Sequence, residues 1–461
     1  MSEALKLDKI EIKQLFNRFN YTIDLVKFSH EGFCILTAPN GYGKTTILKL
    51  IRALPNRDFS VFFNECYEHI TFCLNDNTVI KIKKDKDKDK VNILYQGKVI
   101  PIEDLKSNFS FRESKTLRRI GKKIAFLNET DDETDEEIGE NSNLEKFILQ
   151  NWIENTEHRK NKPHKEIKEL EDKINSLKIY YISTNRLNET LRVRSSLIKN
   201  RPQYLLDKEI KNEKYNSVES IAYNIKSEIN AAQINQFEEG RSKESNFPKR
   251  ILDILVNKTQ ETQEDNLQDL ILEIQQLEEK YSSLGLIPNT QATRQLDSHL
   301  EKAHEDASIL LVLKTYLSDI KEKFALLSNL ANKLDIFQSS VNSLLSFKRV
   351  KITAEDGLKV YLKDKLDDDI PLKTLSSGEQ HLLTLIGCLI FQTKKNDLIL
   401  IDEPEISFHP QWQERFVDIL SQIRSNNDFN VIISTHSPIL IGIKYWDSVI
   451  ELREQCDNLE G

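Results

Sequence analysis

The residue types most suited to chemistry occur in a glycine-rich segment near the start of the chain, residues 38–46, which read Ala-Pro-Asn-Gly-Tyr-Gly-Lys-Thr-Thr. This segment lies between an apolar run at 33–36, which suits a buried strand, and a helical pattern that begins at Ile47. Gly41 and Gly43 allow backbone angles that other residues resist. Consecutive N–H groups can therefore converge on phosphate oxygens at the start of a helix. The segment predicts a phosphate-binding loop.

Two side chains of this loop have the chemistry that a bound nucleoside triphosphate needs. Lys44 is expected to reach the β- and γ-phosphates of ATP, and the Thr45 hydroxyl is expected to bind Mg²⁺. Ala38 stands where such a loop begins with glycine, and it fits if its φ stays negative. The competing interpretation is a glycine-rich turn, which the Gly-Lys-Thr order between a strand and a helix disfavours. The expected nucleotide-binding residues of the loop are Asn40, Gly41, Gly43, Lys44, Thr45 and Thr46.

A second group of candidate residues follows four apolar residues at 398–401. Asp402 and Glu403 come at the end of this predicted buried strand, which is where ligands bind in open α/β sheets. Asp402 is expected to hold Mg²⁺ through water, and Glu403 to orient and polarise the water that attacks ATP. The metal and Lys44 would offset the repulsion between the two carboxylates. Taken alone, the segment is equally compatible with a strand that ends in a solvated acidic turn.

A third segment, Leu-Ser-Ser-Gly-Glu-Gln at 375–380, precedes a strongly apolar helical run at 381–391. Ser376 can cap that helix, and Gly378 lets a phosphate approach the backbone. Alone, the segment could be an ordinary capped helix. Placed shortly before the acidic strand and far downstream of the phosphate loop, it resembles the signature motif of ABC-type ATPases of the SMC, Rad-fifty and RecF branch. The resemblance implies that Ser376 and Gly378 bind the γ-phosphate of ATP held by another subunit.

The same resemblance implies roles for two further residues. His436 follows an apolar run at 430–435 and matches the histidine that contacts the γ-phosphate and senses its loss in this branch. Asn185 follows a short predicted strand at 178–182, at the place where the family carries a glutamine to the metal and the water. Asparagine reaches less far than glutamine. The neighbouring Arg186 could serve instead, although a surface arginine is the simpler interpretation.

Composition limits the classes of protein that the chain can be. Its 461 residues suffice for about two to four domains, and its formal charge of −8 argues against a broadly basic, DNA-wrapping surface, though not against a local basic groove. The five cysteines have no paired metal spacing, which favours a reducing cytoplasm, and Cys34 and Cys388 are expected to be buried in apolar runs. We see no secretory segment and no apolar run of membrane-spanning length, so we expect a cytoplasmic protein.

Apolar patterns divide the chain into three predicted parts. Residues 1–200 hold the first half of an α/β ATPase head of the ABC type, with a mixed sheet, an antiparallel β meander and an acidic loop. Residues 201–346 form a helical insertion with a short coiled-coil hairpin, and residues 347–461 complete the head. The hairpin seam runs from Leu267 to Leu334 and would project about 30–60 Å. Strands are predicted at 7–12, 21–25, 60–63, 69–74, 78–83, 91–95, 350–352 and 358–361.

Three segments of the predicted head have two interpretations each. The turn that holds Phe16 and Phe19 could stack on adenine or pack under the sheet. The basic run at 112–123 could contact nucleic acid, but it lacks interleaved aromatic residues and fits a solvated helix face better. The acidic run at 129–140 is predicted to be a disordered loop, and could also bind a basic partner.

Residues 35–49 and 375–446 together resemble the compact RecF-like ATPases of bacterial antiphage systems, most closely the stand-alone ATPases of the PARIS and then the Septu systems. The resemblance implies a homo-oligomer, with ATP and Mg²⁺ at its subunit interfaces. It also implies a separately encoded nuclease effector that the ATPase holds and then releases or activates on infection, with a phage protein as a candidate trigger. We expect no nuclease domain in the chain itself, because only 25 residues follow His436.

Two other functions stay open at this stage. A DNA-repair ATPase of the RecF kind would clamp DNA directly, which requires a basic groove and gives strongly salt-dependent binding. The acidic balance of the chain counts against that function. A scaffold that binds ATP without hydrolysing it would have no need of Glu403 and His436, so the presence of both residues counts against it.

Overall fold

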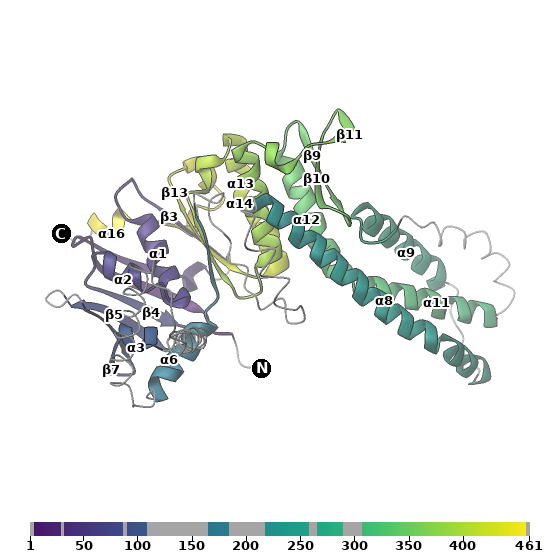
Figure 1. Cartoon of the computed structure of the whole chain (residues 1–461), viewed down its shortest axis with the longest axis horizontal. Helices are drawn as coiled ribbons and strands as arrows, with labels where there is room; N and C mark the ends of the chain where they lie inside the picture. Colours follow the sequence, from purple (N-terminus) through teal and green to yellow (C-terminus); the bar gives the residue numbers. More distant parts are fainter. Residues whose placement is uncertain are drawn as a thin grey trace, which may run out of the picture.

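The computed structural model describes residues 4–28, 32–85, 90–107, 165–183, 217–257, 265–288 and 307–457. Two sheets and their helices form a head, from which long helices project as an arm (Figure 1). The basic run at 112–123 and the acidic run at 129–140 lie outside the described residues. The three-part division of the chain stays a prediction, since its first boundary, at residue 200, also lies outside them.

The centre of the head is a parallel sheet of five strands, in the order β14 (Val449–Glu451), β3 (Phe33–Thr37), β13 (Asn430–Thr435), β12 (Leu398–Asp402) and β8 (Ile179–Ile182). Its three central strands, β3, β13 and β12, are nearly all apolar and buried, as expected of strands covered on both faces. The register places Ile433 between Ile35 and Ile401. The two ends of the chain therefore meet in adjacent strands.

This parallel sheet separates two hydrophobic cores. Alternate residues of β3 point to opposite faces, so Cys34 and Leu36 join one core and Ile35 joins the other. The first core contains helix α1 (Lys44–Asn56), helix α6 (Lys165–Ser176) and an antiparallel sheet. The second contains the helices that lead to the arm. Cys34 and Cys388 are both buried, which confirms their predicted placement.

The antiparallel sheet has six strands, in the order β2 (Phe19–Asp24), β1 (Leu7–Leu15), β4 (His69–Leu74), β5 (Val79–Asp85), β6 (Lys90–Tyr95) and β7 (Lys98–Pro101). It is followed by α3 (Ile102–Ser107). The predicted meander is confirmed, with one correction. The run at 60–63 is not a strand but part of helix α2 (Ser60–Asn64). Four residues are too few for periodicity to distinguish the two, and Asp58 starts the helical turn by accepting hydrogen bonds from Ser60 Oγ and Val61 N, at 2.6 and 3.2 Å.

On the other face of the parallel sheet lie α12 (Ser328–Leu344), α13 (Ser377–Gly387), a π-helical turn η4 (Cys388–Gln392) and α14 (Pro410–Asn427). A small sheet of β11 (Lys365–Asp369), β10 (Gly357–Leu362) and β9 (Lys348–Thr353) confirms the predicted hairpin. The predicted α/β architecture is thus confirmed. The predicted mixed sheet is not found among the described strands, because the parallel and antiparallel strands lie in separate sheets. The short helices are η1 (Val26–Phe28), η3 (Leu372–Thr374), η5 (Pro404–Ser407), α15 (Pro438–Ile441), η6 (Trp446–Ser448) and α16 (Glu454–Asp457).

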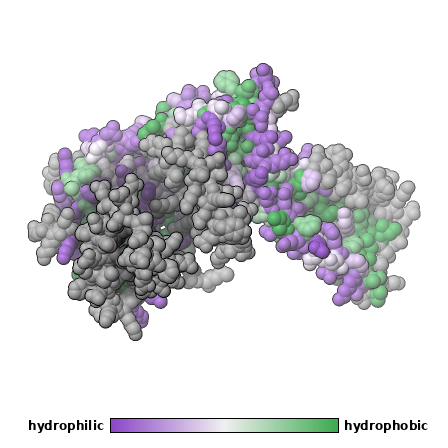
Figure 2. All heavy atoms as spheres, viewed as in Figure 1, coloured by the Kyte–Doolittle hydropathy of each residue, from purple (hydrophilic) through white to green (hydrophobic). Residues whose placement is uncertain are grey.

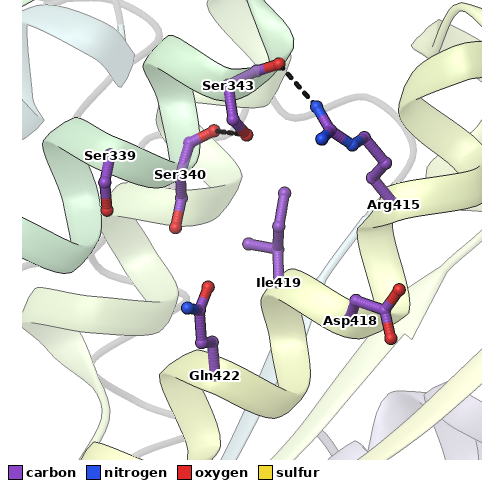
Figure 3. A pocket seen from close by; sticks show the side chains of 7 residues that line it. All are labelled: Ser339, Ser340, Ser343, Arg415, Asp418, Ile419 and Gln422. Atoms are coloured by element: carbon purple, nitrogen blue, oxygen red, sulfur yellow. Dashed lines mark hydrogen bonds between the residues drawn. The ribbon is translucent and has the colours of Figure 1, made fainter.

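A pocket opens between α12 and α14, seen in close-up in Figure 3. Arg415 donates to the Ser343 carbonyl at 2.9 Å, and Asp418 accepts from Lys444 Nζ and the Tyr445 hydroxyl. These three contacts within the chain already engage the pocket's charged groups. The residues that line it are Ser339, Ser340, Ser343, Arg415, Asp418, Ile419 and Gln422.

The arm consists of α8 (Ser217–Asn257), α9 (Asp265–Ser283) and α11 (Ala307–Ala325), with α11 packed on both of the others. The 41 residues of α8 give it a length of about 60 Å. The predicted helices are confirmed at 267–283 and 307–325, but the predicted run to Leu334 is interrupted by a turn at 326–327, after which α12 begins. The coiled-coil seam stays a prediction because residues 289–306 lie outside the described part. None of the helices that the structure describes has both the length and the apolar character needed to cross a bilayer.

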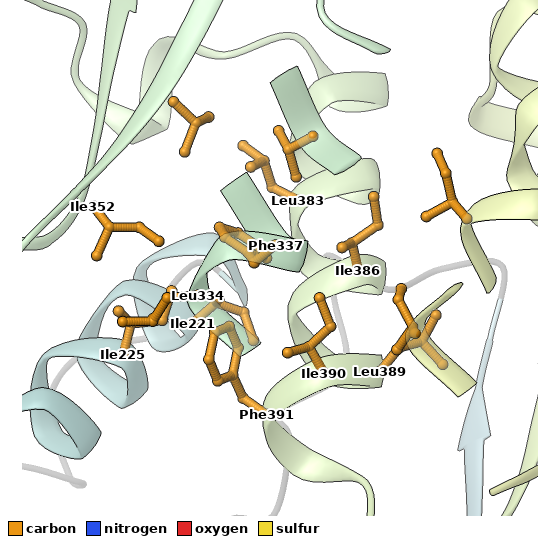
Figure 4. Close-up of a cluster of buried hydrophobic side chains, with 14 of the residues drawn as sticks. Ile221, Ile225, Leu334, Phe337, Ile352, Leu383, Ile386, Leu389, Ile390 and Phe391 are labelled. Carbon is orange, nitrogen blue, oxygen red and sulfur yellow. The ribbon is translucent and has the colours of Figure 1, made fainter. Parts of the chain in front are cut away.

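The base of the arm is built into the second core, directly beneath α13. Ile221 and Ile225 of α8 pack among Phe337 of α12 and Ile386 of α13 (Figure 4). Gly387, at the end of α13, lies directly against α8, since a Cβ built on it would lie 2.6 Å from Ile221 Cγ2. Only glycine lets the two helices come this close.

Replacing Gly387 with alanine should therefore destabilise the protein, because the added methyl group must displace Ile221. We expect the free energy of unfolding to fall by about 1–3 kcal/mol, measured by urea denaturation. Adding Ile221→Ala should make the double variant more stable than the sum of the two single effects predicts. Strictly additive effects would show that the two side chains do not compete for this space.

Candidate active site

The phosphate loop lies at the carboxyl end of β3, beside the carboxyl ends of β12 and β13. Gly43 adopts φ 83°, and a Cβ there would lie 2.9 Å from both Leu15 and Phe16, so only glycine fits. The Tyr21 hydroxyl donates to the Tyr42 carbonyl at 2.9 Å and ties the loop to the antiparallel sheet. Ala38 does not adopt a positive φ, which confirms the condition under which it replaces glycine.

Lys44 begins α1 and is only 4% exposed. Its Nζ donates to the Ala38 carbonyl at 2.9 Å and lies 2.8 Å from Nε2 of His436. Burial lowers the pKa of Lys44, and the nearby carboxylates of Glu403, Glu405 and Asp402 oppose that shift only in part. The residues expected to share one phosphate, Lys44 and His436, are thus already in contact.

Thr45 and Asp402 meet from opposite ends of the chain. The Thr45 hydroxyl donates to Asp402 Oδ1 at 3.0 Å, so the two oxygens that were predicted to hold Mg²⁺ are adjacent. Asp402 is buried and also accepts from Ser434 Oγ, at 2.5 Å, and from the Tyr181 hydroxyl, at 3.0 Å. Hard oxygen donors, one of them a carboxylate, are the ligands that Mg²⁺ takes beside phosphates. The residues present therefore fit this metal.

Glu403 follows Asp402 in a left-handed conformation, with φ 44° and ψ 59°, which is uncommon outside glycine. Its N–H donates to the Ser434 carbonyl at 2.9 Å, which holds the turn. One carboxylate oxygen, Oε1, lies 3.0 Å from His436 Nε2. The backbone is thus held in a costly geometry that directs the Glu403 carboxylate at the predicted γ-phosphate sensor.

The signature residues stand on a different element. Ser376 caps α13: its Oγ accepts from Glu379 N at 3.3 Å, and its own N–H donates to Glu379 Oε2 at 2.9 Å. Lys348 completes this cap with a 2.7 Å ion pair to Glu379. Ser376 is exposed and Gly378 is partly so. The hydrogen bonds of Ser376 are made within α13 and not with the phosphate loop.

Sequence reasoning missed three side chains that shape the site. Tyr181 and Ser434 both donate to Asp402, and Glu405 Oε1 accepts from His436 N at 2.7 Å. Each lies in a segment whose motif was noted, but only the strand register could have shown their contacts. Asn185 lies outside the described residues, so its role stays a prediction.

The aromatic turn before β2 reaches the phosphate loop. Phe16 is 40% exposed and lies against Gly43, whereas Phe19 is buried and stacks on Tyr42 with ring centroids 5.3 Å apart. Packing is therefore the role that the structure gives Phe19. Adenine stacking stays a prediction, and Phe16 is the exposed aromatic of the turn that could provide it.

A profile of the AAA ATPase domain matches residues 6–441. The chain belongs to this family. The phosphate loop, acidic strand and capped helix are arranged around one sheet, so the predicted α/β ATPase head with a helical insertion is confirmed. Its assignment to the ABC type stays a prediction. AAA ATPase domain proteins bind nucleotides, and the fit of Thr45 and Asp402 to Mg²⁺ agrees with that membership.

Similarity to individual proteins is local. The retron Vc95 probable ATPase of Vibrio cholerae serotype O1 biovar El Tor is 27% identical over 152 residues, which cover 27% of this chain and 29% of that protein. The retron Ec83 probable ATPase of Escherichia coli is 27% identical over 158 residues, covering 28% and 29%. Protein ea59 of Escherichia phage lambda is 34% identical over 70 residues, covering 15% and 13%. The chain thus matches less than a third of the length of each relative.

Among solved structures, the chain is similar to SMC heads. One is the Smc head domain with an extended coiled coil, bound to the C-terminal domain of ScpA, derived from Pyrococcus furiosus, with a TM-score of 0.39, 15% identity and 99% of each chain covered. Another is the SMC head domain from Thermotoga maritima, with a TM-score of 0.32, 10% identity, and 95% of this chain and 91% of that chain covered. At these scores the structures say nothing of function.

Replacing Lys44 with methionine should abolish the thermal stabilisation that Mg²⁺-ATP gives, because the phosphates lose their buried cation. Without nucleotide, the Tm of the variant at neutral pH should be unchanged or higher. The folded-state pKa of Lys44 is lowered, so folding disfavours its charged form, and a neutral side chain escapes that cost.

The matched control is Lys49→Met, which changes an exposed lysine of the same helix. It should keep the full stabilisation by Mg²⁺-ATP in the same thermal-shift measurement. A Lys44→Met protein that is still stabilised by the nucleotide would refute the assigned role of Lys44.

Proposed function

We propose that this chain is a slowly hydrolysing, cytoplasmic ATPase that works as a homo-oligomer in a bacterial antiphage defence system. ATP binds between copies, and the assembly holds a separately encoded nuclease effector, which it releases or activates when a phage protein triggers it. Support comes from membership of the AAA ATPase domain family, from the two retron probable ATPases among its relatives, and from the motifs at 35–49 and 375–446.

One observation carries the proposal of a shared site. Lys44, Thr45, Asp402, Glu403 and His436 contact one another, directly or through a neighbour of the set. Ser376, by contrast, stands exposed at the start of a helix whose free N–H groups suit a phosphate. A second copy, related by a two-fold axis, would bring its Ser376 and Gly378 to the ATP held by the first.

The chemistry is transfer of a phosphoryl group to water, in which the protein supplies position and charge. Glu403 is placed to orient the attacking water and accept its proton, and His436 to read the γ-phosphate. Mg²⁺, held by Thr45 and Asp402, would neutralise charge on the phosphate oxygens. In the described conformation Lys44 Nζ contacts the Ala38 carbonyl and His436 Nε2, so it must leave these partners before it can bind the phosphates. That requirement favours slow turnover.

Replacing Glu403 with glutamine should stop hydrolysis and leave ATP binding intact, because the amide keeps the shape of the side chain but cannot take a proton. We expect hydrolysis to fall by at least roughly 100-fold. The variant should also form an ATP-dependent oligomer that persists, visible as a mass increase in light scattering. Glu414→Gln makes the same chemical change on the exposed face of α14 and should behave as the wild type.

A mixing experiment tests whether two copies share each site. Lys44→Met and Ser376→Arg should each be inactive alone, because every site in either homodimer carries one defect. Mixed dimers have one site that combines the intact Lys44 of one copy with the intact Ser376 of the other. With random pairing, activity should return to about a quarter of the wild-type rate.

The control mixture combines Lys44→Met with Glu403→Gln, two changes in the same half of the site. No mixed dimer then contains an intact site, and activity should stay absent. If the first mixture also stays inactive while its members are folded and associate, ATP is not shared between copies in this way.

A further inference from the structure

Helix α8 carries large apolar side chains on the face that points away from the rest of the arm. Its opposite face packs in the second core, where Ile221, Ile225 and Ile229 are buried. The exposed set spans most of the helix, and each member is more than half exposed. The set, which we call the outer stripe, consists of Tyr223, Ile234, Phe237, Leu252 and Val256.

The spacing of the outer stripe is that of one helical face. From Tyr223, the other four residues lie close to whole numbers of turns away at about 3.6 residues per turn. Hydrophobic side chains are visible among hydrophilic ones on the surface of the arm in Figure 2. Exposed apolar side chains repeated along one face of a long helix, here with polar residues such as Arg241 and Ser245 between them, are typical of a surface that another helix covers.

The pattern of this face is self-complementary when read in opposite directions. Ile234 and Leu252 are equally far from position 243, on either side of it, and Phe237 and Pro248 are nearly so. A two-fold axis near that position would therefore lay Ile234 of one α8 on Leu252 of another, and Phe237 on Pro248, with the two helices antiparallel. Apolar side chains then meet on both sides of the axis, with the exposed Arg241 and Ser245 between them on the same face.

Charges on the flank of the stripe follow the same symmetry. Glu238 and Lys249 are both exposed, lie about three turns apart on one side of the stripe, and are again centred on about position 243. In the antiparallel pair, Glu238 of each copy would face Lys249 of the other. Opposite charges at the two symmetry-related positions specify this register and orientation.

We propose that the outer stripe of α8 is a docking surface for the α8 of a second copy of this chain, in an antiparallel pair centred on residue 243. The overlap uses the outer two-thirds of the arm and leaves the two heads at opposite ends. Such a pair is distinct from the one that shares ATP. If the shared-site proposal also holds, each chain has two different two-fold interfaces, which together build a closed ring or an open filament.

The test uses the full chain without nucleotide, so that only the arm interface is populated. Sedimentation velocity over a concentration series should show a monomer–dimer equilibrium. Glu238→Lys and Lys249→Glu should each weaken it by roughly tenfold or more, because like charges then face each other twice. An equimolar mixture of the two variants should regain wild-type affinity, since every contact in the mixed dimer again joins opposite charges.

Phe237→Asp should abolish the dimer, whereas Val99→Asp, which changes another well-exposed apolar residue, on β7, should not alter it. Circular dichroism shows whether each variant is folded. For Glu238→Lys and Lys249→Glu, recovery of the dimer in their mixture is independent evidence that both variants are folded. A wild-type chain that stays monomeric at micromolar concentration, an unaffected Phe237→Asp dimer, or a mixture without rescue would each overturn the proposal. Lys44→Met should dimerise normally here, which separates this interface from the nucleotide-dependent one.

Discussion

The head depends on the pairing of β3 with β13 and β14. These strands come from opposite ends of the chain, yet they lie side by side in one parallel sheet, with β3 and β13 almost entirely buried. Closing so long a loop costs only slightly more entropy than closing a moderate one, because the cost grows with the logarithm of length. Burial of the apolar strand residues on both faces of the sheet offsets this entropy cost. The contact of Thr45 with Asp402 exists only because this pairing forms.

Part of the site could be predicted from the sequence, and the part that could not depends on the register of this sheet. The phosphate loop and the acidic strand are local patterns of glycine and apolar residues, so their residues could be named from the sequence. The contacts of Tyr181 and Ser434 with Asp402 depend on the register between β8, β12 and β13, where Asp402 lies opposite Ser434. Register between segments so distant leaves no local pattern. The short run at 60–63 was predicted wrongly because its helical turn depends on Asp58 outside it.

Helix α13 connects Ser376, the proposed phosphate-binding residue, to the base of the arm. Ser376 caps the first turn of α13, and Gly387, eleven residues of helix later, touches Ile221 at the base of α8. An α-helix of three turns moves as a unit, and close-packed interiors deform little. A change in the angle between the arm and the head must therefore displace Ser376 or repack Phe337. Binding of a partner to the arm could thus move Ser376, the residue proposed to contact the phosphate of a neighbouring copy, through packed side chains.

The ring of His436 lies between a cation and an anion. Lys44 Nζ lies 2.8 Å from Nε2 and 3.3 Å from Nδ1, and Glu403 Oε1 lies 3.0 Å from Nε2. A neutral ring with its hydrogen on Nε2 therefore donates to Glu403 and accepts from Lys44 at Nδ1. A phosphate that draws Lys44 Nζ away would remove the donor at Nδ1 and leave the hydrogen bond between Nε2 and Glu403 in place. Nucleotide binding would in this way change which partners orient the imidazole ring, next to the carboxylate that is proposed to take a proton from water.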